Sequence, residues 1–302
     1  MIAAAPGAGV GNLESVRAVI FDVDGVLLDA SPSYHAVAEE AARRAVAVAL
    51  GARAAANLPF DRAREIPRFK AAGGFNDDWE MSCAIALVLL LRARLGPSVP
   101  PLAQLLAEAQ GLGLGGIARA RGTQALAGLS PGSLDALSHV RIARACCALY
   151  GGRAHCRELF GFEATEAIPD APEEGLWRRE EPLVDAAILA RAAARFPLAL
   201  FTGRNPGEAA LALTLTGLDI DARLRWVSDG RARKPHPEGL LFLCRELLRE
   251  GGVALFLGDT ADDARAAAAA QDAGARLIYA HIAAPGDTTR ALTQLLAASE
   301  PA

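Results

Sequence analysis

The fold is decided by the stretch Phe21-Asp22-Val23-Asp24-Gly25-Val26-Leu27-Leu28-Asp29. It follows a short apolar run, residues 16–20, which predicts a buried parallel strand. Asp22 and Asp24 therefore lie where that strand ends. In open α/β sheets, ligands bind in the crevice beyond the carboxyl ends of the strands. Two carboxylates there repel each other unless a cation or a proton offsets their charge, so we expect this strand end to carry chemistry.

The C-terminal part of the chain alternates short apolar runs with amphipathic segments. Strands are expected over residues 197–202, 224–228, 253–257 and 276–280, and helices over residues 206–215, 236–250, 262–272 and 288–297. Asn205 followed by Pro206 is typical of a helix N-terminus. The alternation predicts an α/β fold, with a Rossmann-like parallel sheet and helices on both faces.

A long segment without strand patterns separates the first strand from the others. Helices are expected there over residues 32–50, 84–95, 102–110, 134–150 and 153–160, and the glycine-rich residues 111–116 and 128–132 are expected to form loops. We therefore predict a catalytic core from residues 15–30 and 183–302, with an inserted, mainly α-helical domain over residues 31–182. We expect this insertion to lie over the strand ends from which it emerges, and residues 1–14 to be a flexible N-terminal segment.

Composition excludes several classes of protein. The 302 residues are 52% hydrophobic and 22% charged, and the net charge of −4 gives no basic surface for nucleic acid or an anionic membrane. Five cysteines without CxxC spacing suggest neither a disulfide framework nor a zinc site. Residues 1–14 lack the pattern of a signal peptide, and the apolar run 84–91 is too short to cross a bilayer. We expect a cytoplasmic protein with reduced thiols; its oligomeric state is open, and a homodimer is one option.

Four polar features occur in order, each at an expected strand end or in the loop that follows. They are Asp22 with Asp24, then Thr202-Gly203-Arg204, then Lys234, and finally Gly258-Asp259-Thr260-Ala261-Asp262-Asp263. Each feature alone is common as a turn, a helix cap or a solvated charge. Their joint occurrence at strand ends predicts one site.

A phosphate ester would use every one of these features. One carboxylate can act as a nucleophile and carry a phosphoryl group, and a second can protonate the leaving oxygen and then deprotonate water. A hydroxyl and a backbone N–H can hold phosphate oxygens, while a lysine neutralises charge. Further carboxylates are the ligands that Mg²⁺ prefers. Transfer then depends on positioning and charge stabilisation.

The same four motifs resemble those of the haloacid dehalogenase (HAD) superfamily of phosphohydrolases. "DVDGVLLD" is similar to that family's first motif, "LFTGR" to the second, "KPHP" to the third and "GDTADD" to the fourth. The resemblance covers roughly residues 15–30 and 183–302. It implies a Rossmann-like core with a mobile cap domain, and the insertion between the first and second motifs is where such families carry a helical cap.

The resemblance also implies roles for individual residues. Asp22 would be the nucleophile and Asp24 the general acid and base. Thr202 and Gly203 would hold phosphate, and Lys234 would clamp the charge. The metal ligands would be Asp22, Asp24 through its backbone carbonyl, Asp259 and Asp263, with Asp262 a weaker alternative to Asp263.

Substrate choice is expected to depend on the insertion. Lys70, Asn76 and Trp79 lie in a polar and aromatic cluster beside Gly73-Gly74, which is either a specificity loop or a helix N-terminus with a packed tryptophan. Arg204 is either a substrate contact or a solvated arginine.

The leading hypothesis is a Mg²⁺-dependent phosphatase that acts on a small phosphorylated metabolite through an aspartyl-phosphate intermediate. The alternatives are a phosphomutase of the same fold and, from another class, a non-catalytic binding protein. A metal-free dehalogenase would leave Asp24 and the acidic fourth motif without a role. A dinucleotide-binding enzyme is disfavoured because no GxGxxG follows the first strand.

Overall fold

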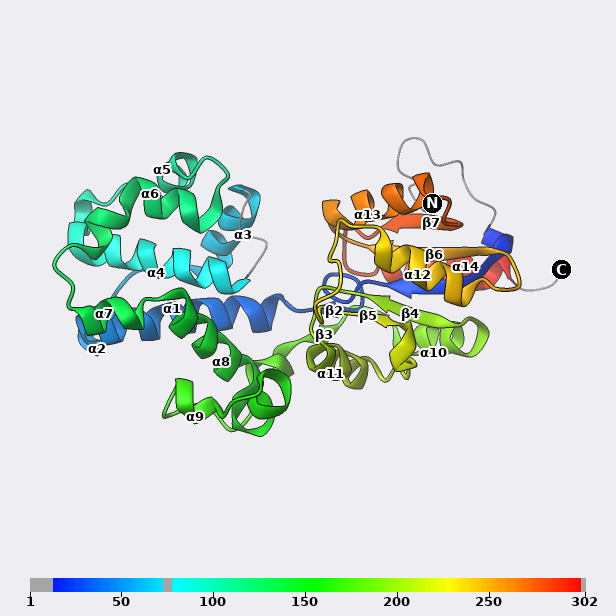
Figure 1. Cartoon of the computed structure of the whole chain (residues 1–302), viewed down its shortest axis with the longest axis horizontal. Helices are drawn as coiled ribbons and strands as arrows, with labels where there is room; N and C mark the ends of the chain where they lie inside the picture. The colour runs from blue at the N-terminus through cyan, green and yellow to red at the C-terminus, as the bar shows by residue number, and fades with distance from the viewer. Residues whose placement is uncertain (1–12, 73–77, 300–302) are drawn as a thin grey trace. The chain divides into compact units, whose positions relative to one another are not determined.

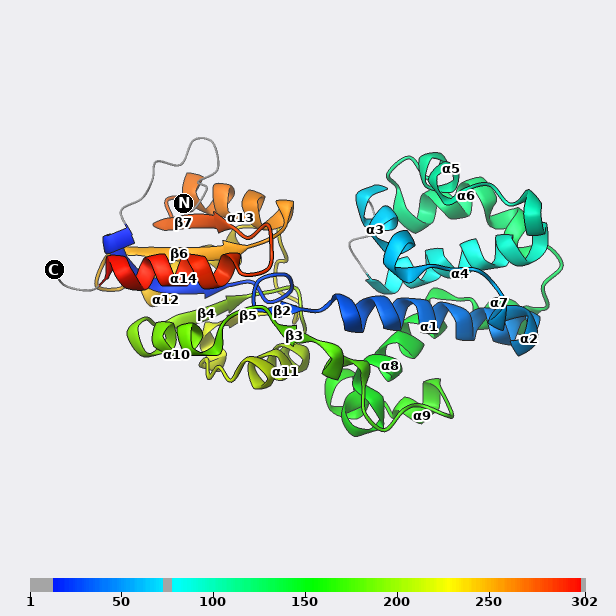
Figure 2. The ribbon, with the colours of Figure 1, turned by 180° about the vertical axis from the view of Figure 1, so that it is seen from behind.

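The computed structural model of the chain describes residues 13–72 and 78–299. The chain divides into two compact units, which are drawn in Figures 1 and 2. A core unit combines Met1–Ala30 with Glu180–Ala302, and a helical unit comprises Ser31–Arg179. Of the expected N-terminal segment, residues 1–12 lie outside the described residues, and the following residues form the 3₁₀ helix η1, Leu13–Ser15.

The core unit is built on a five-stranded sheet. Its strands are β1 (Val16–Phe21), β4 (Leu198–Phe201), β5 (Arg225–Trp226), β6 (Val253–Gly258) and β7 (Leu277–His281). The order is β5-β4-β1-β6-β7, and every pairing is parallel. In the central strand, Ile20 lies opposite Ala199 on one side and Phe256 on the other. The predicted α/β fold with a parallel sheet is therefore confirmed.

Helices cover both faces of this sheet (Figure 2). The first face carries α10 (Ala186–Arg195), α11 (Pro206–Thr216) and α14 (Asp287–Ala298), and the second carries α12 (Glu238–Leu247) and α13 (Ala261–Asp272). Because side chains alternate along a strand, Val19 and Phe21 join the first buried cluster while Ala18 and Ile20 join the second. A further 3₁₀ helix, η4 (Ala222–Leu224), leads into β5.

The chain connections diverge at the ends of β1 and β6. The chain that leaves β1 returns to the sheet through α10 on the first face, whereas the chain that leaves β6 turns into α13 on the second. Adjacent strands whose connections diverge in this way form a topological switch point, where open α/β sheets bind their ligands.

A short two-stranded ribbon joins the ends of the insertion. In it β2 (Leu28–Asp29) pairs antiparallel with β3 (Glu181–Pro182). The core unit thus ends at Ala30 and resumes at Glu180. Residues 180–182 were expected to belong to the helical segment, but they lie in the core unit, because a strand of two residues is too short to give a pattern in the sequence.

The helical unit consists of nine helices and two 3₁₀ turns among its described residues. They are α1 (Ser31–Leu50), α2 (Ala52–Ala56), α3 (Arg62–Ala72), α4 (Asp78–Leu95), η2 (Gly96–Ser98), α5 (Leu102–Glu108), α6 (Gly113–Leu126), α7 (Pro131–Ala136), α8 (His139–Phe160), α9 (Ala164–Ala167) and η3 (Leu176–Arg179). Helix α4 packs against α1, α6 and α8. The segment Trp79–Ser98 is long and apolar enough to cross a membrane by length and composition, but 56% of its apolar window is buried inside the protein.

The glycine-rich part of the insertion differs from the expectation. Residues 113–116 were expected to be a loop, but they form the first turn of α6. A β-carbon on Gly116 would lie 2.1 Å from the carbonyl oxygen of Ala109, so glycine is required there for close packing. Pro131 and Gly132, also expected in a loop, begin α7. The expected break near residue 152 is present as a kink in α8 at Gly152, where φ is 64°.

Candidate active site

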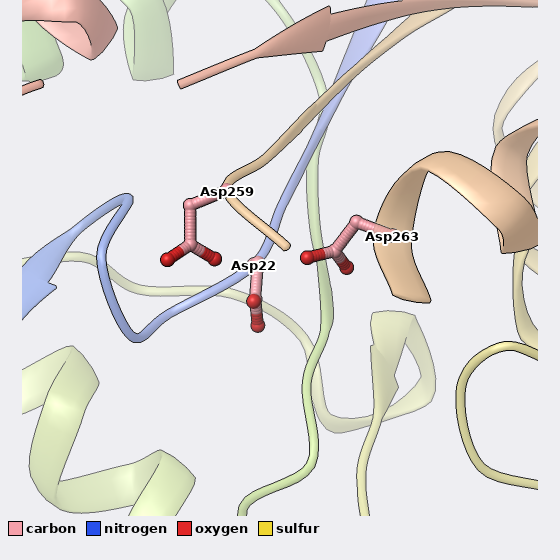
Figure 3. Close-up of side chains that lie close together, drawn as sticks. All are labelled: Asp22, Asp259 and Asp263. Carbon is pink, nitrogen blue, oxygen red and sulfur yellow. The ribbon is translucent and has the colours of Figure 1, made fainter. Parts of the chain in front are cut away.

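Three carboxylates converge at the carboxyl ends of β1 and β6 (Figure 3). Asp22 follows β1, Asp259 follows β6, and Asp263 lies in the first turn of α13. One oxygen from each side chain lies within 4.8 Å of the others. Asp22 and Asp263 are buried, and Asp259 is half-buried. Asp22 is at least 237 positions away from the other two acids in the sequence. The fold therefore brings together carboxylates from distant parts of the chain.

Local sequence explains how the acids are brought together. Thr260 and Asp263 cap α13 reciprocally: the Asp263 N–H donates to Thr260 Oγ1 at 3.2 Å, and the Thr260 N–H donates to Asp263 Oδ2 at 3.1 Å. Gly25 has a φ of 72°, and a β-carbon there would lie 2.1 Å from Asp259 Oδ2. A β-carbon on Gly258 would lie 2.6 Å from that of Asp263. Both glycines are needed for this close approach.

Lys234 supplies a cation to this carboxylate cluster. Its Nζ lies 2.8 Å from Asp22 Oδ1 and 2.6 Å from Asp263 Oδ1, and its side chain is only 12% exposed. Lys234 is one of two lysines in the chain, which otherwise uses arginine for positive charge. An ammonium is a compact point charge, which suits a position between two acids.

The cluster still carries more negative than positive charge. Burial raises the pKa of Asp22 to about 7, against the lowering effect of Lys234, and the charges of Asp263 and Asp24 raise it further. Burial, together with the charge of Asp263, also raises the pKa of Asp259 to about 6. Burial alone would lower the pKa of Lys234, but the carboxylates of Asp22 and Asp263 raise it above its usual value, so the lysine stays charged.

The donor set fits a hard divalent cation. Asp259 Oδ1 is buried and has no hydrogen-bond partner among the described residues. An unpaired buried carboxylate oxygen is costly unless something compensates it. Mg²⁺ takes oxygen ligands in proteins, carboxylates among them. Asp262 is turned away from this set, because its side chain pairs with Arg265.

Thr202 and Gly203 follow β4, the strand next to β1. The Thr202 side chain is buried, and its Oγ1 accepts a hydrogen bond from the Arg204 N–H at 3.2 Å. The Thr202 hydroxyl acts as an acceptor in this contact, so its proton is available for a hydrogen bond to a ligand. The N–H of the exposed Gly203 makes no hydrogen bond to any described residue, and a β-carbon there would meet nothing within 4 Å. The loop after β4 thus offers two hydrogen-bond donors, the Thr202 hydroxyl and the Gly203 N–H. No neighbouring atom requires glycine at position 203.

The structure excludes one of the two interpretations of Arg204, the solvated arginine, and the substrate contact stays a prediction. The Arg204 side chain is 1% exposed, so it is not solvated, and its guanidinium is occupied by Asp24 and Glu180. Glu180 was missed by the sequence analysis. It lies in a segment with no strand or motif pattern, and only the arginine of "LFTGR" hinted at a buried partner.

The remaining predicted residues belong to the helical unit. Lys70 is exposed in the last turn of α3. Trp79 is half-buried in α4, with its ring 5.8 Å from that of Tyr34, which in turn stacks on Tyr150 at 5.2 Å. This packing supports the structural interpretation of Trp79. Asn76 lies outside the described residues.

A comparison with protein families identifies the family of the chain. The family described as haloacid dehalogenase-like hydrolase matches residues 16–271. The chain belongs to the haloacid dehalogenase-like hydrolase family. The resemblance found in the sequence motifs is therefore confirmed. No curated protein matches this hydrolase.

Solved structures share the fold of this HAD-like hydrolase. Phosphatase Tt82 from Thermococcus thioreducens is 23% identical, with a TM-score of 0.64 over 91% of this chain and 98% of that one. A structural-genomics target is 15% identical, with a TM-score of 0.61 over 94% of this chain and 100% of that one. At these identities the similarity shows the fold alone.

Proposed function

We propose that this protein is a Mg²⁺-dependent phosphatase that hydrolyses a small phosphorylated metabolite of the cytoplasm through an aspartyl-phosphate intermediate. One observation carries the proposal: Asp22 lies at the switch point of the sheet, in contact with Lys234 and within one carboxylate cluster with Asp259 and Asp263. Membership of a hydrolase family and the fold shared with a protein named as a phosphatase support it.

In the first step, Asp22 attacks the phosphorus and the bond to the leaving oxygen breaks. Asp24, two residues further on, gives its proton to that oxygen. In the second step, water attacks the phosphorus of the aspartyl phosphate, and Asp24 takes a proton from the water. The bond to Asp22 breaks and free phosphate leaves.

The other residues hold charge in place during both steps. The Thr202 hydroxyl and the Gly203 N–H would donate to phosphate oxygens, and Lys234 would neutralise Asp22 and the phosphate together. Asp22, Asp259 and Asp263, with the Asp24 carbonyl, would hold Mg²⁺. The ion would stabilise the developing charge of the transferred phosphoryl group and favour the ionised form of Asp22.

We further propose that the helical unit is the cap that selects the substrate. Lys70, Asn76 and Trp79 are the residues that would do so. Replacement of Lys70 by Gln should change the preference among phosphate esters while hydrolysis of p-nitrophenyl phosphate continues. An unchanged preference across the panel would reject this role for Lys70.

The test of the reaction is phosphate release from a panel of phosphorylated metabolites and from p-nitrophenyl phosphate. Asp22→Asn should abolish turnover while the fold survives. Asp262→Asn is the matched control, since its side chain faces Arg265 and not the cluster, and it should keep most of the activity. Exhaustive EDTA treatment should remove activity and Mg²⁺ should restore it. Parent-level turnover by Asp22→Asn would reject the proposal, and isomerisation without phosphate release would indicate a mutase.

A further inference from the structure

A buried ion pair in the core unit takes no part in the steps above. Arg204 and Glu180 have side chains that are 1% and 0% exposed, and Arg204 Nη2 donates to Glu180 Oε2 at 2.8 Å. Two ions removed from water are costly even when paired, so such a pair is weak evidence for a purely stabilising role. The other contacts of Arg204 and Glu180 therefore indicate what this buried ion pair does.

The guanidinium of Arg204 also binds Asp24, and it does so through one oxygen only. Arg204 Nε and Nη2 donate to Asp24 Oδ1 at 3.1 and 2.5 Å. The other oxygen, Oδ2, makes no hydrogen bond to any described residue, and the Asp24 side chain is 43% exposed. One oxygen is therefore anchored while the other stays open for a proton. The open oxygen is the one that can give a proton in the first step and take one in the second.

Arg204 is itself held firmly by the sheet. Its N–H donates to Thr202 Oγ1 at 3.2 Å, its carbonyl accepts from the Ser228 N–H at 2.8 Å, and its Nη1 donates to the Glu208 carbonyl at 3.5 Å. These contacts tie it to the loops after β4 and β5 and to the start of α11. An anchor of this kind fixes the orientation of the carboxylate that it binds.

Glu180 connects this anchor to the ribbon at the ends of the insertion. It directly precedes β3 and is the first residue of the core unit after the helical unit. Asp24 in turn forms a bridge with Leu28 of β2, the strand that pairs with β3. Asp24, Arg204 and Glu180 thus span the place where the chain leaves and re-enters the core.

We propose that Arg204, held by Glu180, is a positioning residue that fixes Asp24 for proton transfer in both steps. The proposal rests on the proposed phosphatase function. It adds a residue that acts only through Asp24 and does not touch the reacting atoms.

The test uses two leaving groups. p-Nitrophenolate leaves without a proton, so the first step should continue in Arg204→Gln, while the second step, which needs Asp24 as a base, should slow. We expect a rapid release of about one p-nitrophenolate per enzyme, followed by turnover slowed about 10- to 100-fold. An alkyl phosphate such as glycerol phosphate needs a proton from Asp24 in the first step as well. Its kcat should therefore fall as much as that of p-nitrophenyl phosphate or more, and no burst should appear. Its KM should change little.

A double variant separates positioning from a structural effect. Because Arg204 acts through Asp24, Arg204→Gln combined with Asp24→Asn should be no slower than Asp24→Asn alone. Two results would overturn the proposal. One is an equal loss of kcat on p-nitrophenyl phosphate and on glycerol phosphate, with no burst of p-nitrophenolate. The other is a double variant whose loss of kcat is the product of the losses of the two single variants. If Arg204→Gln does not fold, Arg204→Lys is used instead. Its ammonium can pair with only one of the two carboxylates, so we expect a smaller burst and a smaller loss of kcat than for Arg204→Gln.

A matched control removes a comparable ion pair elsewhere. Arg92 pairs with Glu65 at 2.8 Å in the helical unit, with side chains 13% and 15% exposed, and Arg92→Gln should show no burst. Parent turnover and the Asp22→Asn variant are measured first. If the parent releases no phosphate, the phosphatase function fails and the role of Arg204 fails with it. If the parent turns over and Arg204→Gln behaves like it, only the role of Arg204 is rejected.

Discussion

Replacement of Lys234 by Gln should destabilise the metal-free core unit in a strongly pH-dependent way. Lys234 Nζ lies within 2.8 Å of both Asp22 and Asp263, and it is 12% exposed. Removal of one partner from a buried pair costs about 3–5 kcal/mol. The carboxylates can escape part of this cost by taking up protons, so we expect a loss of about 3 kcal/mol at high pH and much less at low pH.

The direction of the pH dependence follows from Asp22. Its pKa is about 7 even with Lys234 present, and loss of the ammonium moves it further above the unfolded value. A carboxyl whose pKa is raised in the folded state stabilises the fold at low pH, and this contribution is lost as pH rises through the folded pKa. Lys234 itself keeps its proton throughout, because its own pKa is raised.

The assay is thermal unfolding of the whole protein in EDTA, followed by circular dichroism at about pH 5.5 and about pH 8. A loss of about 3 kcal/mol corresponds to a fall of roughly 6–12 °C in the unfolding midpoint. Lys70→Gln, which removes the chain's other, exposed lysine, is the control and should change little. An Lys234→Gln variant that is as stable as the parent at about pH 8, or equally destabilised at both pH values, would refute the reasoning.

Three further predictions concern the same unit. Burial raises the pKa of Glu208 to about 7, so its contribution to stability is lost as pH rises from about 4.5 to about 7. Glu208→Gln, which can keep the helix-capping contact, should leave stability at about pH 5 unchanged and raise it by up to roughly 3 kcal/mol at about pH 8 in denaturant titrations. No gain in stability at high pH would contradict this. Gly25→Ala should displace Asp259 and remove activity, whereas Gly217→Ala, with a φ of 68° and open space around it, should cost only about 1–2 kcal/mol and keep activity. Because Asp22 and Asp259 have raised pKa values, apparent Mg²⁺ affinity measured by thermal shift should weaken about tenfold or more from about pH 7.5 to about pH 5.5; a pH-independent affinity would argue against these ligands.

The sequence predicted the core well because its signals are local. Polar residues directly after apolar runs marked the strand ends, and Asn205 before Pro206 marked the start of α11, where its side chain accepts from the Glu208 N–H. Strand ends of a parallel sheet share one edge, so Asp22, Asp259 and Lys234 were expected to meet.

The sequence failed where the cause is tertiary. Gly113 and Gly116 have low helix propensity, yet they lie in α6, where Gly116 packs against the backbone of Ala109. Arg204 looked like a surface residue or a substrate contact, because Glu180, its buried partner, lies in a segment without any pattern. Composition and spacing carry no information on such long-range pairs.

The central claim is that Asp22 carries the phosphoryl group. The most direct measurement is to quench the enzyme during turnover of p-nitrophenyl phosphate, reduce it with borohydride and map the peptides by mass spectrometry. An aspartyl phosphate is reduced to homoserine, whereas a free carboxylate is not. The account predicts homoserine at position 22, dependent on substrate and absent from Asp24, Asp259 and Asp263. Homoserine at any of those three positions, or none at position 22 under conditions where phosphate is released, would contradict it.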